Sequence, residues 1–106
     1  MMRSEVWWIN FDLSVGGEIR KKRPAVIVSN NAANQFLNRV QVVPLTSSVG
    51  KLYPSETYVT FRGRMAKAMA DQLTTVSKER FMNQAGKISK TEMEGVERAI
   101  IVQLGL

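Results

Sequence analysis

The chain has 106 residues and a mass of 11.9 kDa, a length typical of one domain, so we expect residues 1–106 to form a single unit. It has neither cysteine nor histidine, which excludes disulfides and zinc–thiolate sites and removes the commonest acid–base group at neutral pH. Chemistry here must use carboxylates, cations and hydroxyls. The sequence predicts no membrane span and no signal peptide, so we expect a cytoplasmic protein.

Lysine and arginine outnumber aspartate and glutamate by 15 to 9, and the excess lies in the middle of the chain. Residues 20–67 hold nine cations and one acid, Glu56, whereas residues 68–106 hold five of each sign. Because the middle stretch has the apolar alternation of a folded segment, we expect its cations to form a surface patch. Such a patch favours a polyanion as the partner.

Two strands are predicted near the N-terminus. Residues 5–11 are aromatic and β-branched and predict a strand, after which residues 13–19 form a loop with two glycines. Residues 24–29 are nearly all apolar and predict a second strand that is buried on both faces. Pro24 is expected at the first position of this strand, where a missing N–H is tolerated.

The next elements are a short helix and a third strand. Residues 30–36 predict the helix, with Asn30 as its cap. Residues 40–45 predict the strand, and Pro44 indicates that this strand lies at an edge or contains a bulge.

The second half of the chain predicts further strands and a terminal helix. Residues 56–61 alternate as a strand, residues 65–76 predict one or two short strands broken near Asp71, and Ser77 caps a helical turn. Ser89 and Glu92 have capping-box spacing at the start of the helix. The expected apolar stripe of this helix consists of Met93, Val96, Ile100 and Leu104. These elements predict a mostly β fold with short helices, a small SH3-like barrel with a C-terminal amphipathic helix.

Two tryptophans are neighbours in the first predicted strand. Trp7 and Trp8 must point to opposite faces of that strand, so at least one of them belongs to the core. We expect core or dimer contacts for both, and an exposed one could stack on a base.

Several short motifs follow one another at a characteristic spacing. They are Asp12 with Gly16-Gly17-Glu18, Arg23-Pro24 and the strand behind it, Val43-Pro44-Leu45-Thr46, Tyr53-Pro54, and Ala70-Asp71-Gln72. In this order they resemble the MazF/PemK family of bacterial toxins, and the resemblance runs from Glu5 to the terminal helix. It implies a CcdB/PemK-type barrel that forms a symmetric homodimer and cuts single-stranded RNA, chiefly mRNA, at short motifs without a metal. It also implies growth arrest, a labile MazE-like antitoxin with an acidic tail, and contact with operator DNA only through the antitoxin complex.

RNA carries its own nucleophile, the ribose 2′-hydroxyl. A ribonuclease therefore needs to align this hydroxyl with the phosphorus and to stabilise the charge that develops. Such a site requires a fixed cation, a group that takes the 2′ proton, and one that protonates the leaving 5′ oxygen. We expect no cofactor and no metal.

Arg23 is the predicted catalytic cation. A guanidinium binds phosphate oxygens bidentately and stays charged at any working pH, and the resemblance makes Arg23 the family's catalytic arginine. The run Arg20-Lys21-Lys22-Arg23 could instead be only a solvated loop. Arg23 differs from the other three because it directly precedes a buried strand, which mounts it rigidly. Lys21 and Lys22 are expected to attract phosphates diffusely.

A hydroxyl and a carboxylate complete the predicted catalytic set. Thr46 ends the third strand and could hold a phosphate oxygen or orient Arg23, with Ser47 as a supporting donor; its alternative role is ordinary strand-end or turn chemistry. Glu18 is the candidate acceptor of the 2′ proton, although an exposed carboxylate with a pKa of about 4 is a weak base unless burial raises that pKa. Arg23 could instead act by charge alone, with water handling the protons.

Asp71 and Gln72 have two interpretations. They could read base edges or brace Arg23, or Asp71 could be a buried side chain that fixes the strand break. The loops around residues 14–22 and 47–55 are expected to decide which RNA motif is cut.

Two other functions stay open. A gyrase-inhibiting toxin similar to CcdB shares this barrel but relies on a C-terminal tryptophan, whereas this chain ends Gln103-Leu104-Gly105-Leu106. A noncatalytic nucleic-acid-binding barrel would explain the net charge of +6 but would leave Arg23 and Thr46 without a role. The leading prediction is a metal-independent endoribonuclease toxin.

Overall fold

The computed structural model describes residues 1–11 and 21–106, so the predicted loop over 13–19 lies outside the described residues. The described part of the chain forms seven strands, two α-helices and two 3-10 turns. The strands are β1 (Glu5–Asn10), β2 (Lys22–Ile27), β3 (Arg39–Thr46), β4 (Glu56–Phe61), β5 (Arg64–Met69), β6 (Thr74–Ser77) and β7 (Phe81–Lys87). The helical elements are α1 (Asn31–Phe36), α2 (Lys90–Leu104) and the turns η1 (Ala70–Gln72) and η2 (Lys78–Arg80).

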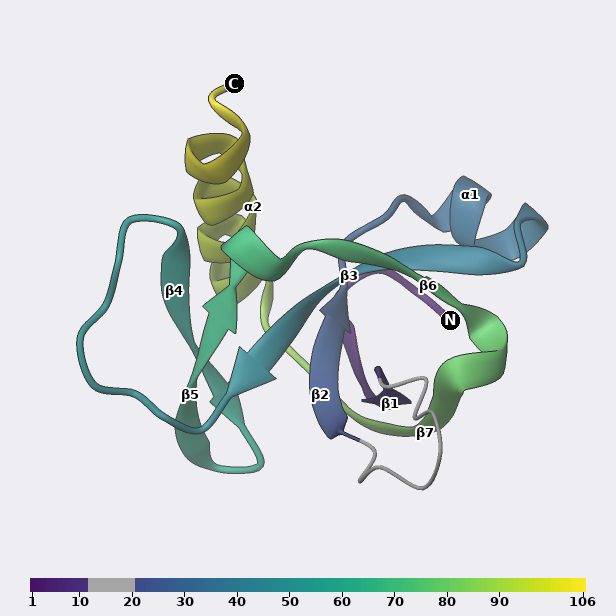
Figure 1. Cartoon of the computed structure of the whole chain (residues 1–106), viewed down its shortest axis with the longest axis horizontal. Helices are drawn as coiled ribbons and strands as arrows, with labels where there is room; N and C mark the ends of the chain where they lie inside the picture. Colours follow the sequence, from purple (N-terminus) through teal and green to yellow (C-terminus); the bar gives the residue numbers. More distant parts are fainter. Residues whose placement is uncertain (12–20) are drawn as a thin grey trace.

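The strands form one antiparallel sheet in the order β4-β5-β3-β2-β1-β7, and β6 pairs with β3. Figure 1 shows this sheet curled into a half-barrel, with α2 standing beside β4 and β5. The predicted small, mostly β barrel with a C-terminal helix is confirmed in this open form. Every strand predicted from the sequence is present, and the segment 65–76 contains two strands separated by η1.

Two prolines that lie in strands differ from their predicted settings. Pro24 is the third residue of β2 and pairs with Trp8, while the ladder to β3 begins only at Ala25. Pro44 lies inside β3, which is a central strand, so the prediction of an edge strand is wrong.

The position of Pro44 explains how a central strand tolerates it. One side of β3 pairs with β2 through Pro44 itself, opposite Ala25. The other side pairs with β6 up to Val42 and with β5 from Leu45 onward. The Gln41 carbonyl accepts a hydrogen bond from the Val28 N–H, one residue past the end of β2. Because backbone groups alternate along a strand, the nitrogen of Pro44 faces the opposite side, toward the interval between β6 and β5.

Apolar side chains are packed on both faces of the sheet, as the continuous apolar sequence of residues 24–29 predicts. One core cluster lies between the sheet and α2. It consists of Val6, Val26, Val43, Leu45, Val59, Ala66, Ala68, Ile88, Met93 and Val96. The second lies on the other face and consists of Ile9, Ala25, Ile27, Val40, Val42 and Val76. Strands β2 and β3 supply alternate residues to both clusters, which holds their register firmly.

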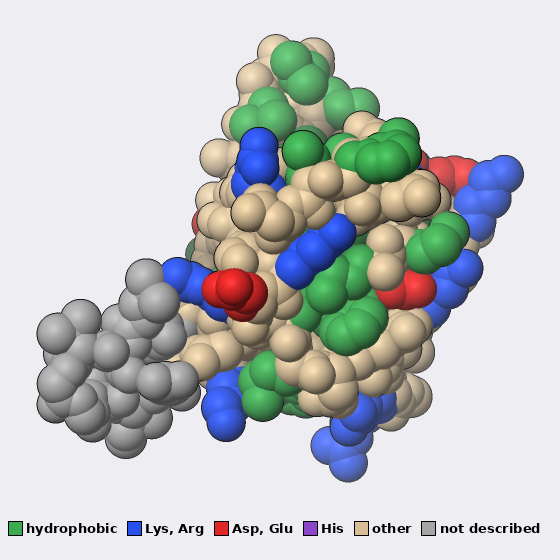
Figure 2. Space-filling model, turned by 90° about the vertical axis from the view of Figure 1, so that its right-hand side faces the viewer, with side chains coloured by type: hydrophobic (Ala, Val, Ile, Leu, Met, Phe, Trp, Pro, Cys, Tyr) green, Lys and Arg blue, Asp and Glu red, His purple; other side chains and the backbone are tan. Residues whose placement is uncertain are grey.

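Both predicted helices begin where their caps indicate. Asn30 accepts a hydrogen bond from the Ala33 N–H, and Ser89 and Glu92 form a complete capping box. Met93 and Val96 are buried, but Leu104 is 54% exposed, so the predicted apolar stripe does not reach the end of α2. Figure 2 shows apolar side chains on this protruding end of the molecule. None of the helices in the described part of the chain has the length and apolar character needed to cross a membrane.

Strand β7 was not predicted from the sequence. Its central residues Met82, Asn83 and Gln84 are exposed, so the strand lacks the apolar alternation by which strands are recognised. It pairs with β1, and that ladder contains two register shifts. Backbone pairing with β1 therefore contributes more to the position of this strand than its own side chains do.

A buried ion pair closes the loop between β3 and β4. The Lys67 Nζ lies 3.0 Å from the Glu56 carboxylate and donates to the Lys51 carbonyl at 2.9 Å. The same carboxylate accepts from the Tyr53 N–H at 2.9 Å. That backbone hydrogen bond lowers the pKa of Glu56, desolvation opposes the change, and Lys67 adds to the lowering.

We predict that Glu56→Gln makes the protein less stable at neutral pH but has little effect in acid. The pKa of Glu56 is lower in the folded chain than its ordinary value of 4.5, so its stabilisation is present above that pH and is lost as the pH falls through the lower folded value. Glutamine keeps an acceptor for Tyr53 but leaves Lys67 without its counter-ion, which should cost about 2 kcal/mol at pH 7. Urea unfolding across pH measures this difference.

The exposed Glu94 on α2 provides the control, and Glu94→Gln should change little. A Glu56→Gln effect that stays constant from neutral pH to strong acid would contradict the role given to the carboxylate charge.

Candidate functional site

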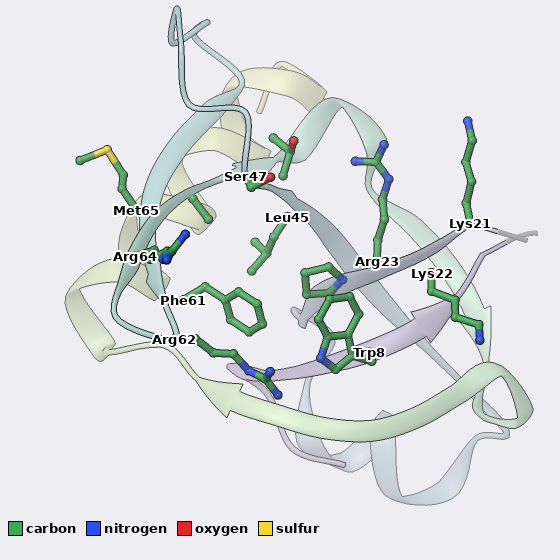
Figure 3. A pocket seen from close by; sticks show the side chains of 13 residues that line it. Trp8, Lys21, Lys22, Arg23, Leu45, Ser47, Phe61, Arg62, Arg64 and Met65 are labelled. Atoms are coloured by element: carbon green, nitrogen blue, oxygen red, sulfur yellow. The ribbon is translucent and has the colours of Figure 1, made fainter.

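A cleft of about 770 Å³ opens where β1, β2 and the end of β3 meet the hairpin between β4 and β5. Its apolar lining includes Trp8, Pro24, Leu45, Phe61 and Ala66. Its cations are Lys21, Lys22, Arg23, Arg62 and Arg64, and the described residues that line it include no aspartate or glutamate. Figure 3 shows these cations arranged around Trp8, Phe61 and Leu45. The cleft therefore combines an apolar interior with a positive surround.

Arg23 is mounted on one of the most constrained strands of the fold. It is the second residue of β2 and pairs with the fully buried Ile9 of β1. Lys21 and Arg23 extend in the same direction, and Lys22 points away from them, as Figure 3 shows. This is the alternation expected of extended backbone. The four-cation run is therefore not simply a solvated loop, because Lys22 and Arg23 belong to a paired strand.

A second hollow, of about 300 Å³, lies against the same arginine. Its lining consists of Phe11, Lys21, Arg23, Pro44, Gln72 and Thr74. Lys21 and Arg23 thus line both hollows and stand between them. A polymer that occupied both hollows would carry its backbone past the guanidinium of Arg23.

Thr46 and Ser47 line the cleft at the end of β3. The Thr46 hydroxyl accepts a hydrogen bond from the Ser48 N–H at 3.2 Å, which is the turn chemistry considered as its alternative role. A hydroxyl that accepts one hydrogen bond still has its own proton to donate. Thr46 is therefore able to stabilise the turn and to donate to an oxygen anion in the cleft.

Asp71 and Gln72 lie together on η1 but differ in their surroundings. Gln72 lines the second hollow beside Arg23, and its amide approaches the Met69 sulfur at 3.6 Å. Asp71 is exposed, so the interpretation of a buried aspartate that fixes the strand break is wrong. The break is closed by the backbone instead, because the Leu73 N–H donates to the Ala70 carbonyl at 3.1 Å.

Glu18, the candidate general base, lies outside the described residues, as does Asp12. No group of three or more acidic, histidine or cysteine side chains within 1–11 and 21–106 is arranged to hold a metal ion.

The β4–β5 hairpin contributes cleft residues that the sequence interpretation missed. Arg62 and Gly63 are its two turn residues, and their φ angles of 53° and 76° are both positive, as in a type I′ turn. The glycine at the second turn position, between two alternating segments, was the signal that could have revealed the hairpin. This turn places Phe61, Arg62 and Arg64 at the cleft.

The two tryptophans divide as strand alternation predicts, but their roles differ. Trp7 packs against the second core cluster, with its ring 5.8 Å from that of Phe81. Trp8 lines the cleft, and its ring meets Phe61 edge to face at 6.1 Å. Both rings are partly exposed, but Trp7 makes the expected core contact, whereas Trp8 lines the cleft.

Comparisons with known proteins identify the family of this chain. The family model described as PemK-like, MazF-like toxin of type II toxin–antitoxin system matches residues 2–104. Endoribonuclease MazF9 of Mycobacterium tuberculosis is 34% identical over 115 aligned positions that cover 100% of this chain and 98% of that protein.

Two solved structures have the same fold. One is a mycobacterial endoribonuclease in complex with its cognate antitoxin, with a TM-score of 0.82, 26% identity and coverage of 100% of this chain and 96% of that one. The other is MazF from Deinococcus radiodurans, with a TM-score of 0.82, 25% identity and coverage of 100% and 97%. With a family model that spans nearly the whole chain and a full-length relative above 30% identity, the chain belongs to the PemK-like, MazF-like toxins of type II toxin–antitoxin systems.

Proposed function

We propose that this chain, an endoribonuclease toxin of the MazF type, cleaves single-stranded RNA, chiefly mRNA, at short sequence motifs and without a metal ion. It acts as a single toxin domain over residues 1–106, as a homodimer, in the cytoplasm. The observation that carries the proposal is the guanidinium of Arg23, mounted on a paired strand between two hollows of a cation-lined surface. The relatives named endoribonuclease support the same activity.

The proposed reaction begins with attack of a ribose 2′-hydroxyl on the neighbouring phosphorus. Arg23 binds two oxygens of the phosphate and stabilises the negative charge that grows as the fifth bond forms. Thr46 donates a hydrogen bond from its hydroxyl to the same phosphate, and Ser47 supports it from the adjacent position. Because Arg23 pairs with β1 and Thr46 pairs with β5, these donors need little rearrangement during the reaction.

Two proton transfers complete the cleavage. Glu18 is proposed to accept the 2′ proton, and water is proposed to donate a proton to the leaving 5′ oxygen. The bond from phosphorus to that oxygen breaks, which gives a 2′,3′-cyclic phosphate (or, after hydrolysis, a 3′-phosphate) and a 5′-hydroxyl end. Lys21, Lys22, Asp71 and Gln72 are proposed to bind the RNA on either side of the scissile phosphate.

Arg23→Ala is expected to abolish cutting while leaving most of the RNA affinity. Loss of a donor to the transition-state charge typically reduces the rate by about 100- to 1,000-fold, whereas several other cations still attract the phosphates. Cut sites and rates are measured by primer extension on a long mRNA. Affinity is measured by fluorescence anisotropy with an RNA made uncleavable by 2′-O-methyl groups.

Arg39→Ala is the matched control, because Arg39 is exposed at the far end of β3 and, within the described residues, its side chain hydrogen-bonds only its neighbour Asn38. Equal loss of cutting and binding in Arg23→Ala would favour a noncatalytic nucleic-acid-binding barrel.

The ends of the products report the mechanism. Cleavage in excess EDTA should proceed at the same rate as cleavage without it, and should leave 5′-hydroxyl ends that kinase can label without prior phosphatase treatment. Cleavage that stops on chelation, or products with 5′-phosphates, would overturn the 2′-hydroxyl mechanism.

The antitoxin is proposed to inhibit by occupying the same cleft. A cognate antitoxin is present in the related mycobacterial complex, and an acidic tail would complement the cations around Arg23. Contact with operator DNA is proposed to occur only through the toxin–antitoxin complex.

An acidic peptide should therefore compete with uncleavable RNA, so that each one raises the apparent Kd of the other. Anisotropy titrations at fixed ionic strength measure this effect, with a neutral peptide of equal length as the control. Simultaneous binding of peptide and RNA with undiminished affinity would show that they use separate sites.

A further inference from the structure

The cleft contains an aromatic cluster for which the cleavage chemistry has no use. The rings of Trp8 and Phe61 lie 6.1 Å apart at an interplanar angle of 67°. The guanidinium carbon of Arg62 lies 6.0 Å from the Trp8 ring and 5.6 Å from the Phe61 ring. Phosphate chemistry needs cations and hydroxyls, but it needs no rings, so another part of the ligand must account for this cluster.

Trp8 is not an ordinary core tryptophan. Trp7, its neighbour on the opposite face, has its indole N–H bonded to Glu5 at 2.9 Å and its ring packed on the core. Trp8 instead lines the cleft, and within the described residues its indole N–H has no such partner. A large ring whose polar edge is open to a cleft is suited to contact a ligand with both apolar faces and polar edges.

Arg62 occupies a backbone position that disfavours arginine. Its φ of 53° places it at the first position of a type I′ turn, where asparagine or glycine is preferred. The turn alone therefore does not explain this residue. Its side chain projects to the aromatic pair in Figure 3, where it carries a planar positive group to the wall of the cleft.

The charge of the cleft identifies the class of ligand. Five cations line it, and its described lining has no carboxylate, so the ligand carries negative charge. The rings and Arg62 form a stacking surface, so the ligand also carries a flat group. A nucleotide with an unpaired base has both properties, and a base held in a duplex could not enter.

We propose that Trp8, Phe61 and Arg62 form a stacking site for one nucleobase of the RNA, close to the phosphate bound by Arg23. This inference rests on the proposed function and adds to it the means by which the substrate is held and aligned. Trp8 and Arg62 are positioning residues: they fix the strand so that the reacting phosphate meets Arg23. Stacking accepts every base, so the site distinguishes a base from its absence and single-stranded from paired RNA.

The test pairs two protein variants with abasic RNA. Trp8→Leu keeps an apolar side chain but removes the ring, and Arg62→Asn removes the cation while suiting the type I′ turn. Each is assayed on a short RNA that contains a mapped cut site, and on versions in which one nucleotide near the cut is abasic. Kd is measured with uncleavable 2′-O-methyl RNA, and KM and kcat with cleavable RNA.

Trp8→Leu is expected to raise Kd and KM about 10-fold on intact RNA and to change kcat much less. At one abasic position the wild-type protein should lose a similar factor, and the two losses should not add, because both remove the same contact. Trp8→Phe should restore most of the binding. Arg62→Asn should be at least as stable as the wild type and should lose affinity at the same abasic position, so the proposal can be tested even if Trp8→Leu does not fold.

The control is Arg39→Gln, which removes an equal charge outside the cleft and should show no coupling to any abasic position. If the wild-type protein cuts RNA but no abasic position is coupled to Trp8 or Arg62, the stacking site is refuted while the proposed function stands. If these variants weaken an acidic peptide and leave RNA binding intact, the cluster is a protein-docking surface and the proposal is wrong. If the wild-type protein cuts no RNA, the proposed function itself fails.

Discussion

The pairing of β2 with β3, buried on both faces, is the constraint on which the cleft depends. Val26 and Val43 face each other in register, and both are fully buried. Neighbouring residues on each strand enter the opposite core cluster, so a shift of one position would expose apolar side chains on both faces. This register also fixes the positions of Arg23, near the start of β2, and Thr46, at the end of β3. The cation and the hydroxyl are therefore placed by apolar packing rather than by contacts of their own.

Charge is distributed so that the cleft keeps its positive potential. Five of the nine cations in residues 20–67 line the cleft. Glu56, the one acid of that stretch, does not line the cleft, and its carboxylate is bound by Lys67 and the Tyr53 N–H. The same ion pair shapes the loop that follows Ser47. The ion pair that stabilises the loop therefore also neutralises the one acidic side chain of this basic stretch.

The sequence predicted much of the fold and part of the candidate site. Strong local signals were interpreted correctly: the capping box at Ser89, the cap at Asn30, and the doubly buried strand after Arg23. Strand β7 was not predicted because its exposed residues show no alternation of apolar and polar side chains. The position of Pro44 was misjudged because the gap between β6 and β5 is a property of the assembled sheet.

Residue order alone determined the barrel, the family and the basic middle of the chain, because these follow from local periodicity, motif spacing and charge counts. Only the tertiary structure decided that Arg62, Arg64 and Phe61 reach the same cleft as Arg23, about 40 positions earlier in the chain. It also decided that Trp8, rather than Trp7, faces that cleft. The physical reason is that strand pairing and sheet curvature bring distant segments together. A local sequence pattern does not determine which face of a strand becomes exposed once the sheet has curled.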